Sequence, residues 1–157
     1  MCCLGAAGVK AHEEVQAETS APTLKENTAY LQRLQQATSR CKDIYIFIED
    51  YEERAEYRAP LSDEEAHTMR RLIAAMRPCA TNMDVDIDPS RYISICFKDN
   101  SVLTIDEIEV ARESDAEPDG SYLLGRFILT DSEYTQWQNL LESAMQRKTI
   151  IPQEADQ

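Results

Sequence analysis

Three signatures for the start of a helix, separated by segments that alternate apolar and polar residues, constrain the fold of this chain most strongly. In each signature a Ser or Thr is followed three residues later by Glu. The hydroxyl and the carboxylate can then each accept a hydrogen bond from an N–H group that the first helical turn leaves unpaired. The signatures are Thr23–Glu26, Ser62–Glu65 and Thr130–Glu133. They predict three helices.

An apolar stripe at helical spacing follows each signature, which supports the same three helices. Pro78 is expected to end the second helix, because proline has no N–H group with which to continue the hydrogen-bond ladder. The stripes consist of Leu24, Leu31, Leu34, Ala37 and Cys41, then Ala66, Met69, Leu72, Ile73 and Met76, and finally Tyr134, Trp137, Leu140, Leu141 and Ala144.

Between the helices the periodicity changes to two, which is typical of β-strands. In residues 43–51 the isoleucines at 44, 46 and 48 point one way, while Tyr45 and Phe47 point the other way. Because both faces are apolar, we expect this strand to be central or covered on both sides. Further strands are predicted at 55–59, 91–98, 102–110 and 122–129. The pattern slips near Asp106-Glu107, which indicates a bulge or an edge.

The resulting prediction is an α+β fold with an antiparallel sheet of about four to five strands packed by three helices, in the order α-β-β-α-β-β-β-α. The 157 residues fit one domain. We assign 1–22 to a signal remnant or flexible tail and linker, 23–147 to a single α+β domain, and 148–157 to a C-terminal tail whose residues 150–152 can dock on the body. The segment Glu117-Pro118-Asp119-Gly120 predicts a tight turn with glycine in the left-handed conformation.

Charge limits the classes of partner. The chain has 29 acidic and 16 basic side chains and a formal net charge of -13. Nucleic-acid affinity comes largely from Lys and Arg at phosphates, so we exclude nucleic acid and expect a basic protein as the partner. The acidic residues expected to bind it are Glu49, Asp50, Glu52, Glu53, Asp115, Glu117 and Asp119.

The N-terminus points to export. Residues 2–9 are an apolar run, and the small Ala11 precedes a polar segment, which resembles the end of a secretory signal whose charged start is missing. The alternatives are a lipid on Cys2 or Cys3 and an inert tail in a cytoplasmic protein. No stretch approaches the roughly 20 apolar residues of a membrane span. We therefore expect an exported protein, in the periplasm, in the envelope or secreted.

The internal cysteines are Cys41, Cys79 and Cys96, so at most one internal disulfide can form. Cys96 lies in a strand pattern and is expected to be buried. Cys41 and Cys79 both follow predicted helices, and a disulfide between them is the pairing that the sequence allows in an oxidising compartment. The absence of a Cys-x-x-Cys pair lowers the prospect of zinc binding.

The sequence patterns that resemble known metal-binding or catalytic motifs are incomplete. Asp84, Asp86 and Asp88 resemble the start of a calcium loop, but Pro89 and Ile95 stand where an EF-hand requires glycine and glutamate. Neither of the two histidines, His12 and His67, has an evident partner that would make it a general base. We therefore predict no catalytic residue and no cofactor, with calcium as the weak alternative.

A similarity between residues 61–72 and 129–140 indicates an internal duplication, or else two strand-to-helix junctions that need the same local chemistry. In the alignment Arg58 matches Arg126, Ser62 matches Thr130 and Leu72 matches Leu140.

Three functions remain open. The first is a non-catalytic acidic binding or interaction module, exported, with a basic protein partner. The second is a hydrolase or lyase that uses two carboxylates about 5–10 Å apart in a cleft. The third is a structural component of an envelope assembly, which an exposed apolar patch on strand 44–48 would favour.

Overall fold

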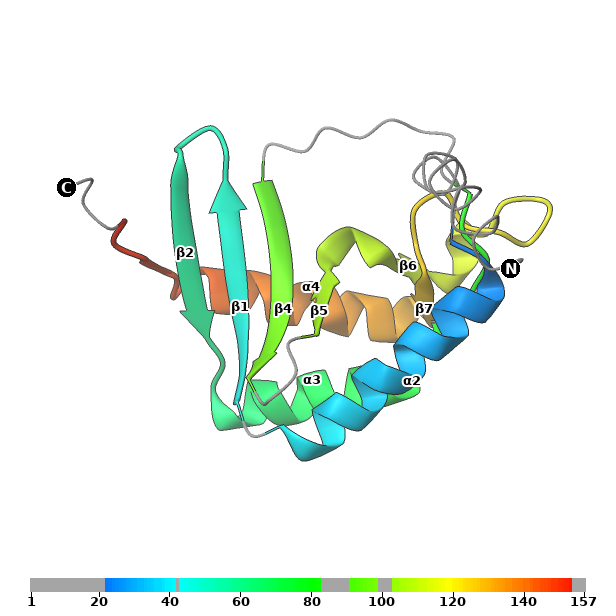
Figure 1. Cartoon of the computed structure of the whole chain (residues 1–157), viewed down its shortest axis with the longest axis horizontal. Helices are drawn as coiled ribbons and strands as arrows, with labels where there is room; N and C mark the ends of the chain where they lie inside the picture. Colours follow the sequence, from blue (N-terminus) through cyan, green and yellow to red (C-terminus); the bar gives the residue numbers. More distant parts are fainter. Residues whose placement is uncertain (1–21, 42, 83–90, 99–102, 154–157) are drawn as a thin grey trace, which may run out of the picture.

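The structure, a computed structural model, describes residues 22–41, 43–82, 91–98 and 103–153 (Figure 1). The helices in these ranges are α2 (Leu24–Arg40), α3 (Asp63–Ala75) and α4 (Asp131–Met145), with short 3-10 helices η1 (Glu107–Glu109) and η2 (Glu113–Asp115). The strands are β1 (Asp43–Asp50), β2 (Ala55–Pro60), β3 (Arg77–Pro78), β4 (Arg91–Lys98), β5 (Thr104–Asp106), β6 (Val110–Arg112), β7 (Phe127–Leu129) and β8 (Thr149–Ile150).

The strands form two sheets, and the larger one is antiparallel as predicted. Its five strands follow the order β5-β4-β1-β2-β8, so the doubly apolar strand β1 is central. Ile46 lies opposite Ala59 of β2 and Ile95 of β4, and all three are buried. The smaller sheet has the order β3-β7-β6, with β6 and β7 parallel. The α+β class and the antiparallel sheet are therefore confirmed.

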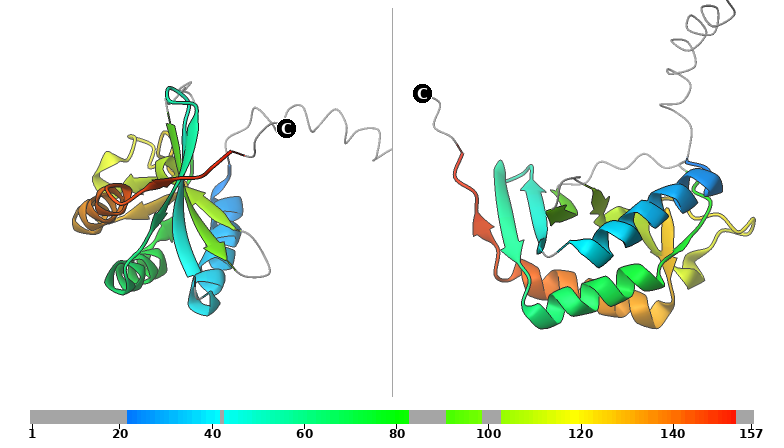
Figure 2. Two further views of the ribbon diagram at one scale, coloured as in Figure 1. Left: turned by 90° about the vertical axis from the view of Figure 1, so that its left-hand side faces the viewer. Right: turned by 60° about the horizontal axis from the view of Figure 1, so that its bottom comes forward.

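The helices cover one side of the sheets and are arranged side by side (Figure 2). Helix α3 contacts both α2 and α4, and α4 contacts β1 and β2 of the larger sheet as well as β6 and β7 of the smaller one. Helix α4 thus joins the two sheets, with Trp137 and Leu141 buried in the common core. None of the described helices combines the length and the apolar character that a bilayer span requires.

All three predicted capping boxes form. The hydroxyls of Thr23, Ser62 and Thr130 accept from the backbone N–H three residues later, and the glutamate carboxylates accept from the N–H of the capping residue. Most residues of the stripes that follow are buried, but Ala66 and Tyr134 are half-buried, and Leu24, at the exposed start of α2, is 51% exposed. The helix starts are therefore fixed by local chemistry, and the helix faces by burial of apolar side chains.

Two strand predictions need correction. The predicted strand 102–110 breaks into β5, η1 and β6, because the Glu109 carboxylate accepts from the Asp106 N–H and closes a 3-10 turn at the point where the pattern slips. Of the predicted strand 122–129, only Phe127–Leu129 is a strand, and it belongs to the smaller sheet.

Two short strands, β3 and β8, were not predicted. Strand β8 lies in the segment assigned to the C-terminal tail: Thr149 and Ile150 pair with β2, and the Ile151 N–H donates to the Glu56 carbonyl. Residues 1–21, which contain the export and lipid candidates, lie outside the described residues.

Burial at the centre of β1 leads to a first prediction. Replacing Ile46, which is fully buried, by alanine should lower the free energy of unfolding by about 2–5 kcal/mol, because it leaves a cavity between the sheet and the helices. The matched control is Ile150→Ala on β8, where the side chain is 61% exposed and the expected change is below about 0.5 kcal/mol. Urea unfolding checks both. Equal losses at the two positions would contradict the described packing.

The contact between the start of α3 and the end of α4 leads to a second prediction. Burial acts to raise the pKa of Glu65, but hydrogen bonds from Ser62, Arg147 and Ser143 and the Arg147 charge outweigh it and lower the pKa below its ordinary value of 4.5. A carboxyl whose pKa is lowered in the folded state stabilises the fold above its unfolded pKa and loses that effect as the pH falls.

Glu65→Gln should therefore be less stable than the wild type by about 0.5–1 kcal/mol at neutral pH, and this difference should shrink as the pH falls below the ordinary pKa of 4.5. Urea unfolding between pH 7 and pH 3 measures it. Glu64→Gln removes an exposed charge from the same helical turn and serves as the control. A difference that grows in acid would contradict the assigned contact.

Candidate functional site: an acidic pocket beside a buried polar network

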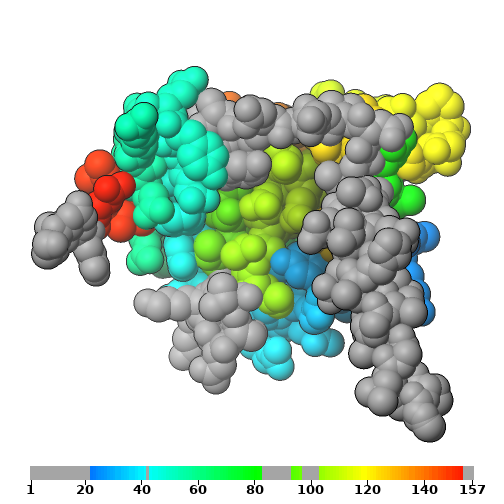
Figure 3. All heavy atoms as spheres, turned by 45° about the horizontal axis from the view of Figure 1, so that its top comes forward, coloured from blue at the N-terminus to red at the C-terminus, as the bar shows by residue number. Residues whose placement is uncertain are grey.

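The two acidic segments singled out in the sequence lie far apart. Glu49, Asp50, Glu52 and Glu53 lie at the β1–β2 hairpin, whereas Asp115, Glu117 and Asp119 follow β6. Figure 3 shows the hairpin and the 113–120 segment at opposite ends of one face. They therefore do not form one continuous surface, and each must be judged by itself.

The segment after β6 forms the wall of a cavity of about 510 Å³, here named the acidic pocket. It is an open pocket lined by residues of η1, β6, η2, the loop before β7 and the first half of α4. Its lining residues are Glu107, Ile108, Val110, Ala111, Asp115, Glu117, Tyr122, Leu123, Leu124, Gly125, Tyr134 and Gln138.

Apolar and aromatic groups form much of the pocket wall. Ile108 and Leu123, two of the large hydrophobic side chains that the described surface leaves exposed, both line it. Tyr122 is buried and its hydroxyl donates to the Glu113 carbonyl at 2.9 Å. Tyr134 is half-buried and its oxygen accepts from the Gln138 amide at 3.2 Å. The wall can thus accept a ligand with apolar surface.

The charged groups of the wall are all acidic. The described lining contains the carboxylates of Glu107, Asp115 and Glu117 and neither lysine nor arginine. Burial raises the pKa of the Tyr134 phenol, the Glu107 charge raises it further, Arg112 opposes the shift and Asp115 adds to it. Two carboxylates and one guanidinium thus act on the ring, so the net charge around it is negative and favours a cation.

Hydrogen bonds fix the loop that carries these carboxylates. Gly120 has the predicted left-handed conformation (φ 88°), and its N–H donates to the Glu117 carbonyl at 2.8 Å. The N–H and hydroxyl of Ser121 donate to Asp119 and lower the pKa of that carboxyl. The Ser114 N–H donates to Asp131 at the start of α4. Asp115 and Glu117 thus line the pocket, while Asp119 stabilises the turn.

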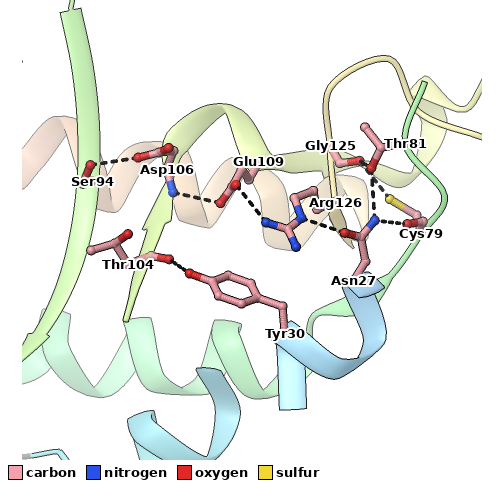
Figure 4. A network of polar contacts seen from close by, with 10 residues as sticks. All are labelled: Asn27, Tyr30, Cys79, Thr81, Ser94, Thr104, Asp106, Glu109, Gly125 and Arg126. Atoms are coloured by element: carbon pink, nitrogen blue, oxygen red, sulfur yellow. Dashed lines mark hydrogen bonds and ion pairs between the residues drawn. The ribbon is translucent and has the colours of Figure 1, made fainter. Parts of the chain in front are cut away.

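A buried polar network lies next to the pocket (Figure 4). Asn27 of α2 is fully buried; its oxygen accepts from Arg126 Nε at 2.6 Å, and its amide donates to the Cys79 carbonyl at 2.5 Å and to Thr81 Oγ1 at 3.0 Å. Arg126 also forms an ion pair with Glu109 at 3.3 Å and lies over the Tyr30 ring. Each of these polar groups therefore has a partner inside the fold.

The network continues into the larger sheet. Glu109 accepts from the Asp106 N–H, and the Asp106 carboxylate accepts from the Ser94 hydroxyl at 2.8 Å. At its other end the Gly125 carbonyl accepts from Thr81 and from the Cys79 thiol. Gly125 also lines the pocket, and a Cβ atom there would lie 2.5 Å from the Ala111 Cβ. The pocket lining and the network thus share one glycine.

Sequence reasoning missed this network as a group. Asn27 occupies a position of the α2 apolar stripe, three residues after Leu24 and four before Leu31. A polar residue on an apolar stripe is the pattern that could have indicated a buried hydrogen-bonded group. Nothing local in the sequence indicates that its partner is Arg126.

The predicted Cys41–Cys79 disulfide is absent from the structure, where both residues are thiols. The Cys41 thiol donates to the Asp43 carbonyl at 2.9 Å, and Cys79 belongs to a separate apolar cluster with Tyr122 and Ile128. Cys96 is buried as expected. Burial raises the pKa of the Cys79 thiol to about 11, so this thiol stays protonated at neutral pH and is a poor nucleophile.

The remaining candidates contribute little chemistry in the described part of the chain. Asp84, Asp86 and Asp88 lie outside the described residues, and within the described ranges no group of three His, Cys, Asp or Glu residues is placed to bind a metal. His67 is exposed on α3. Burial raises the pKa of Glu109, as a catalytic acid would require, but this carboxyl belongs to the Arg126 network and is not a lining residue of the pocket.

An exposed apolar patch on β1 would favour a role in an assembly. Within the described residues, β1 does not expose such a patch. Ile44, Ile46 and Ile48 are buried, and Tyr45 and Phe47 on the other face are half-buried. The Arg58 guanidinium covers the Tyr45 ring at 4.4 Å.

No protein-family model, curated protein or solved structure matches this chain. The chemistry of the pocket is therefore the basis on which a function can be argued.

Removal of the Asn27 side chain tests the network. Asn27→Ala should lower the free energy of unfolding by about 2–4 kcal/mol, because Arg126 Nε and the Cys79 carbonyl would be left buried without their partner. The control Asn139→Ala, at an exposed position of α4, should change it by less than about 0.5 kcal/mol. Thermal or urea unfolding gives both values. A loss at Asn27 no larger than at Asn139 would refute the network's role.

Proposed function

We propose that this protein is a non-catalytic binding module that holds a basic segment of a partner protein in the acidic pocket. The observation that supports this proposal is the combination of three carboxylates with exposed Ile108 and Leu123 and the Tyr134 ring in one cavity of about 510 Å³. Lysine and arginine side chains match such a wall, because each has an aliphatic stem that can contact the apolar groups and a charged end that can pair with the carboxylates.

The charge of the whole chain supports the same class of partner. A formal net charge of -13 attracts a basic segment at long range and repels nucleic acid. The carboxylates of the pocket then fix the position of the segment, and the apolar wall adds affinity through burial.

The hairpin is the weaker of the two acidic candidates. Glu49 and Asp50 line a smaller recess of about 250 Å³, which also includes the chain's own Arg54. The lining of this recess contains neither leucine nor isoleucine and so offers less apolar surface to an aliphatic stem, and we therefore place the primary site at Asp115 and Glu117.

Export is a further part of the proposal and is supported by the apolar residues 2–9 followed by Ala11. A carboxylate-dependent hydrolase or lyase, a structural envelope component and a cytoplasmic location remain the alternatives, and calcium remains the alternative ligand for Asp84, Asp86 and Asp88. Mass spectrometry of the protein purified from its source would identify cleavage or lipidation of the N-terminal segment.

Charge reversal tests the binding proposal. The double variant Asp115→Lys, Glu117→Lys should bind a fluorescein-labelled peptide of alternating arginine and serine at least about tenfold more weakly than the wild type. The salt dependence of binding should also become flatter, because fewer ion pairs form. Fluorescence anisotropy at several salt concentrations measures both quantities.

The control is Glu49→Lys, Asp50→Lys, which reverses the same number of charges at the hairpin. Its affinity should stay within about twofold to threefold of the wild type, since only long-range attraction changes. Equal losses in the two double variants would indicate diffuse attraction to an acidic protein, and unchanged affinity after reversal of Asp115 and Glu117 would exclude the pocket.

A further inference from the structure

A guanidinium group of the chain itself contacts two of the residues that line the acidic pocket. Arg112 Nε lies 3.1 Å from Asp115 Oδ2 and its Nη2 lies 3.4 Å from Asp115 Oδ1, so the guanidinium contacts both oxygens of the carboxylate. The same group lies over the Tyr134 ring, 5.7 Å from its centroid. Asp115 and Tyr134 both line the pocket.

We propose that the acidic pocket binds a single arginine side chain of the basic segment, and that Arg112 is an internal competitor which this arginine displaces from Asp115 and Tyr134. This inference rests on the proposed function and names the ligand group of the same site. The contacts of Arg112 show which chemistry Asp115 and Tyr134 accept: a planar cation that faces the carboxylate with two N–H groups and the aromatic ring with its face.

Arginine suits this geometry better than lysine. A guanidinium presents N–H groups in a rigid planar fork that matches a carboxylate, and it stacks on aromatic rings, whereas an ammonium group is a compact point charge. The Leu123 and Ile108 side chains at the wall can contact the aliphatic stem of an incoming arginine. Once Arg112 has left Asp115, the Asp115 carboxylate can pair with the guanidinium of the incoming arginine. Glu107 and Glu117 provide further negative charge for that guanidinium.

The Arg112–Asp115 pair is suited to exchange because it lies at the surface. The two side chains are 49% and 52% exposed, and exposed ion pairs add little to stability. Arg112 can therefore leave Asp115 without disturbing the fold. Asp115 itself stays in place, because the neighbouring Ser114 N–H donates to Asp131 at the start of α4.

The test compares three peptides that differ at one central residue: acetyl-Ser-Gly-Arg-Gly-Ser-amide and its lysine and citrulline counterparts. Citrulline has the shape of arginine without its charge. Chemical-shift titration of the 157-residue protein measures each affinity. We expect the arginine peptide to bind more tightly than the lysine peptide and the citrulline peptide to bind least.

Arg112→Gln should bind the arginine peptide about twofold to fivefold more tightly than the wild type, the range set by the small net energy of a surface ion pair. Arg112→Lys keeps the positive charge but loses the fork, so it should also bind more tightly, by a smaller factor. The matched control is Arg77→Gln, which removes an arginine from a comparable surface pair with Glu113 outside the pocket lining. It should leave the affinity within about twofold of the wild type.

Weaker or unchanged binding by Arg112→Gln would overturn the competitor role, because it would place Arg112 in the binding surface or outside the site. Equal gains in Arg112→Gln and Arg77→Gln would reduce the effect to net charge, and equal binding of all three peptides would overturn guanidinium recognition. Failure of every basic peptide to bind either the wild type or Arg112→Gln would instead refute the proposed function itself.

Discussion

The arrangement of the two sheets depends on the contacts that the Arg126 guanidinium makes. The guanidinium donates to Asn27 of α2, pairs with Glu109 of η1 and lies over the Tyr30 ring, while the Arg126 backbone bonds to Glu109 and Cys79. A cation that is 79% buried requires such partners, because loss of hydration is compensated only by charge and hydrogen bonds within the protein. One side chain thus fixes helix α2, the smaller sheet and the edge of the larger sheet relative to one another.

Local chemistry explains why most of the fold could be predicted from the sequence. A capping box and an apolar stripe need only neighbouring residues, so α2, α3 and α4 were predicted, and the alternation of β1 and β4 indicated their strands. The smaller sheet depends on pairs distant in sequence, such as Val110 with Phe127, and its strands are too short to show a period. The break at Asp106 was visible as a slip, but its cause, the Glu109 carboxylate, was not.

The site was predictable only in part for the same reason. Its carboxylates Asp115 and Glu117 stand in an evident acidic segment, whereas the wall that makes them a pocket comes from η1, β6 and α4. The similarity of residues 61–72 and 129–140 illustrates the limit of local patterns. Both copies are a strand, a capping box and a helix, yet Arg58 is exposed over Tyr45 and its match Arg126 is at the centre of the buried network.

The spacing of the network along the chain has a consequence for the order of folding. Asn27 is 52 residues from Cys79 and 99 residues from Arg126, so its polar contacts close long loops. Closure of such loops is entropically costly and slow, whereas α2 can form from its own capping box within a few residues. Asn27 can therefore meet all its partners only when the chain is complete to Arg126, whereas the capping box of α2 needs only Thr23 and Glu26. On a ribosome, the pocket becomes complete only after α4 has been synthesised.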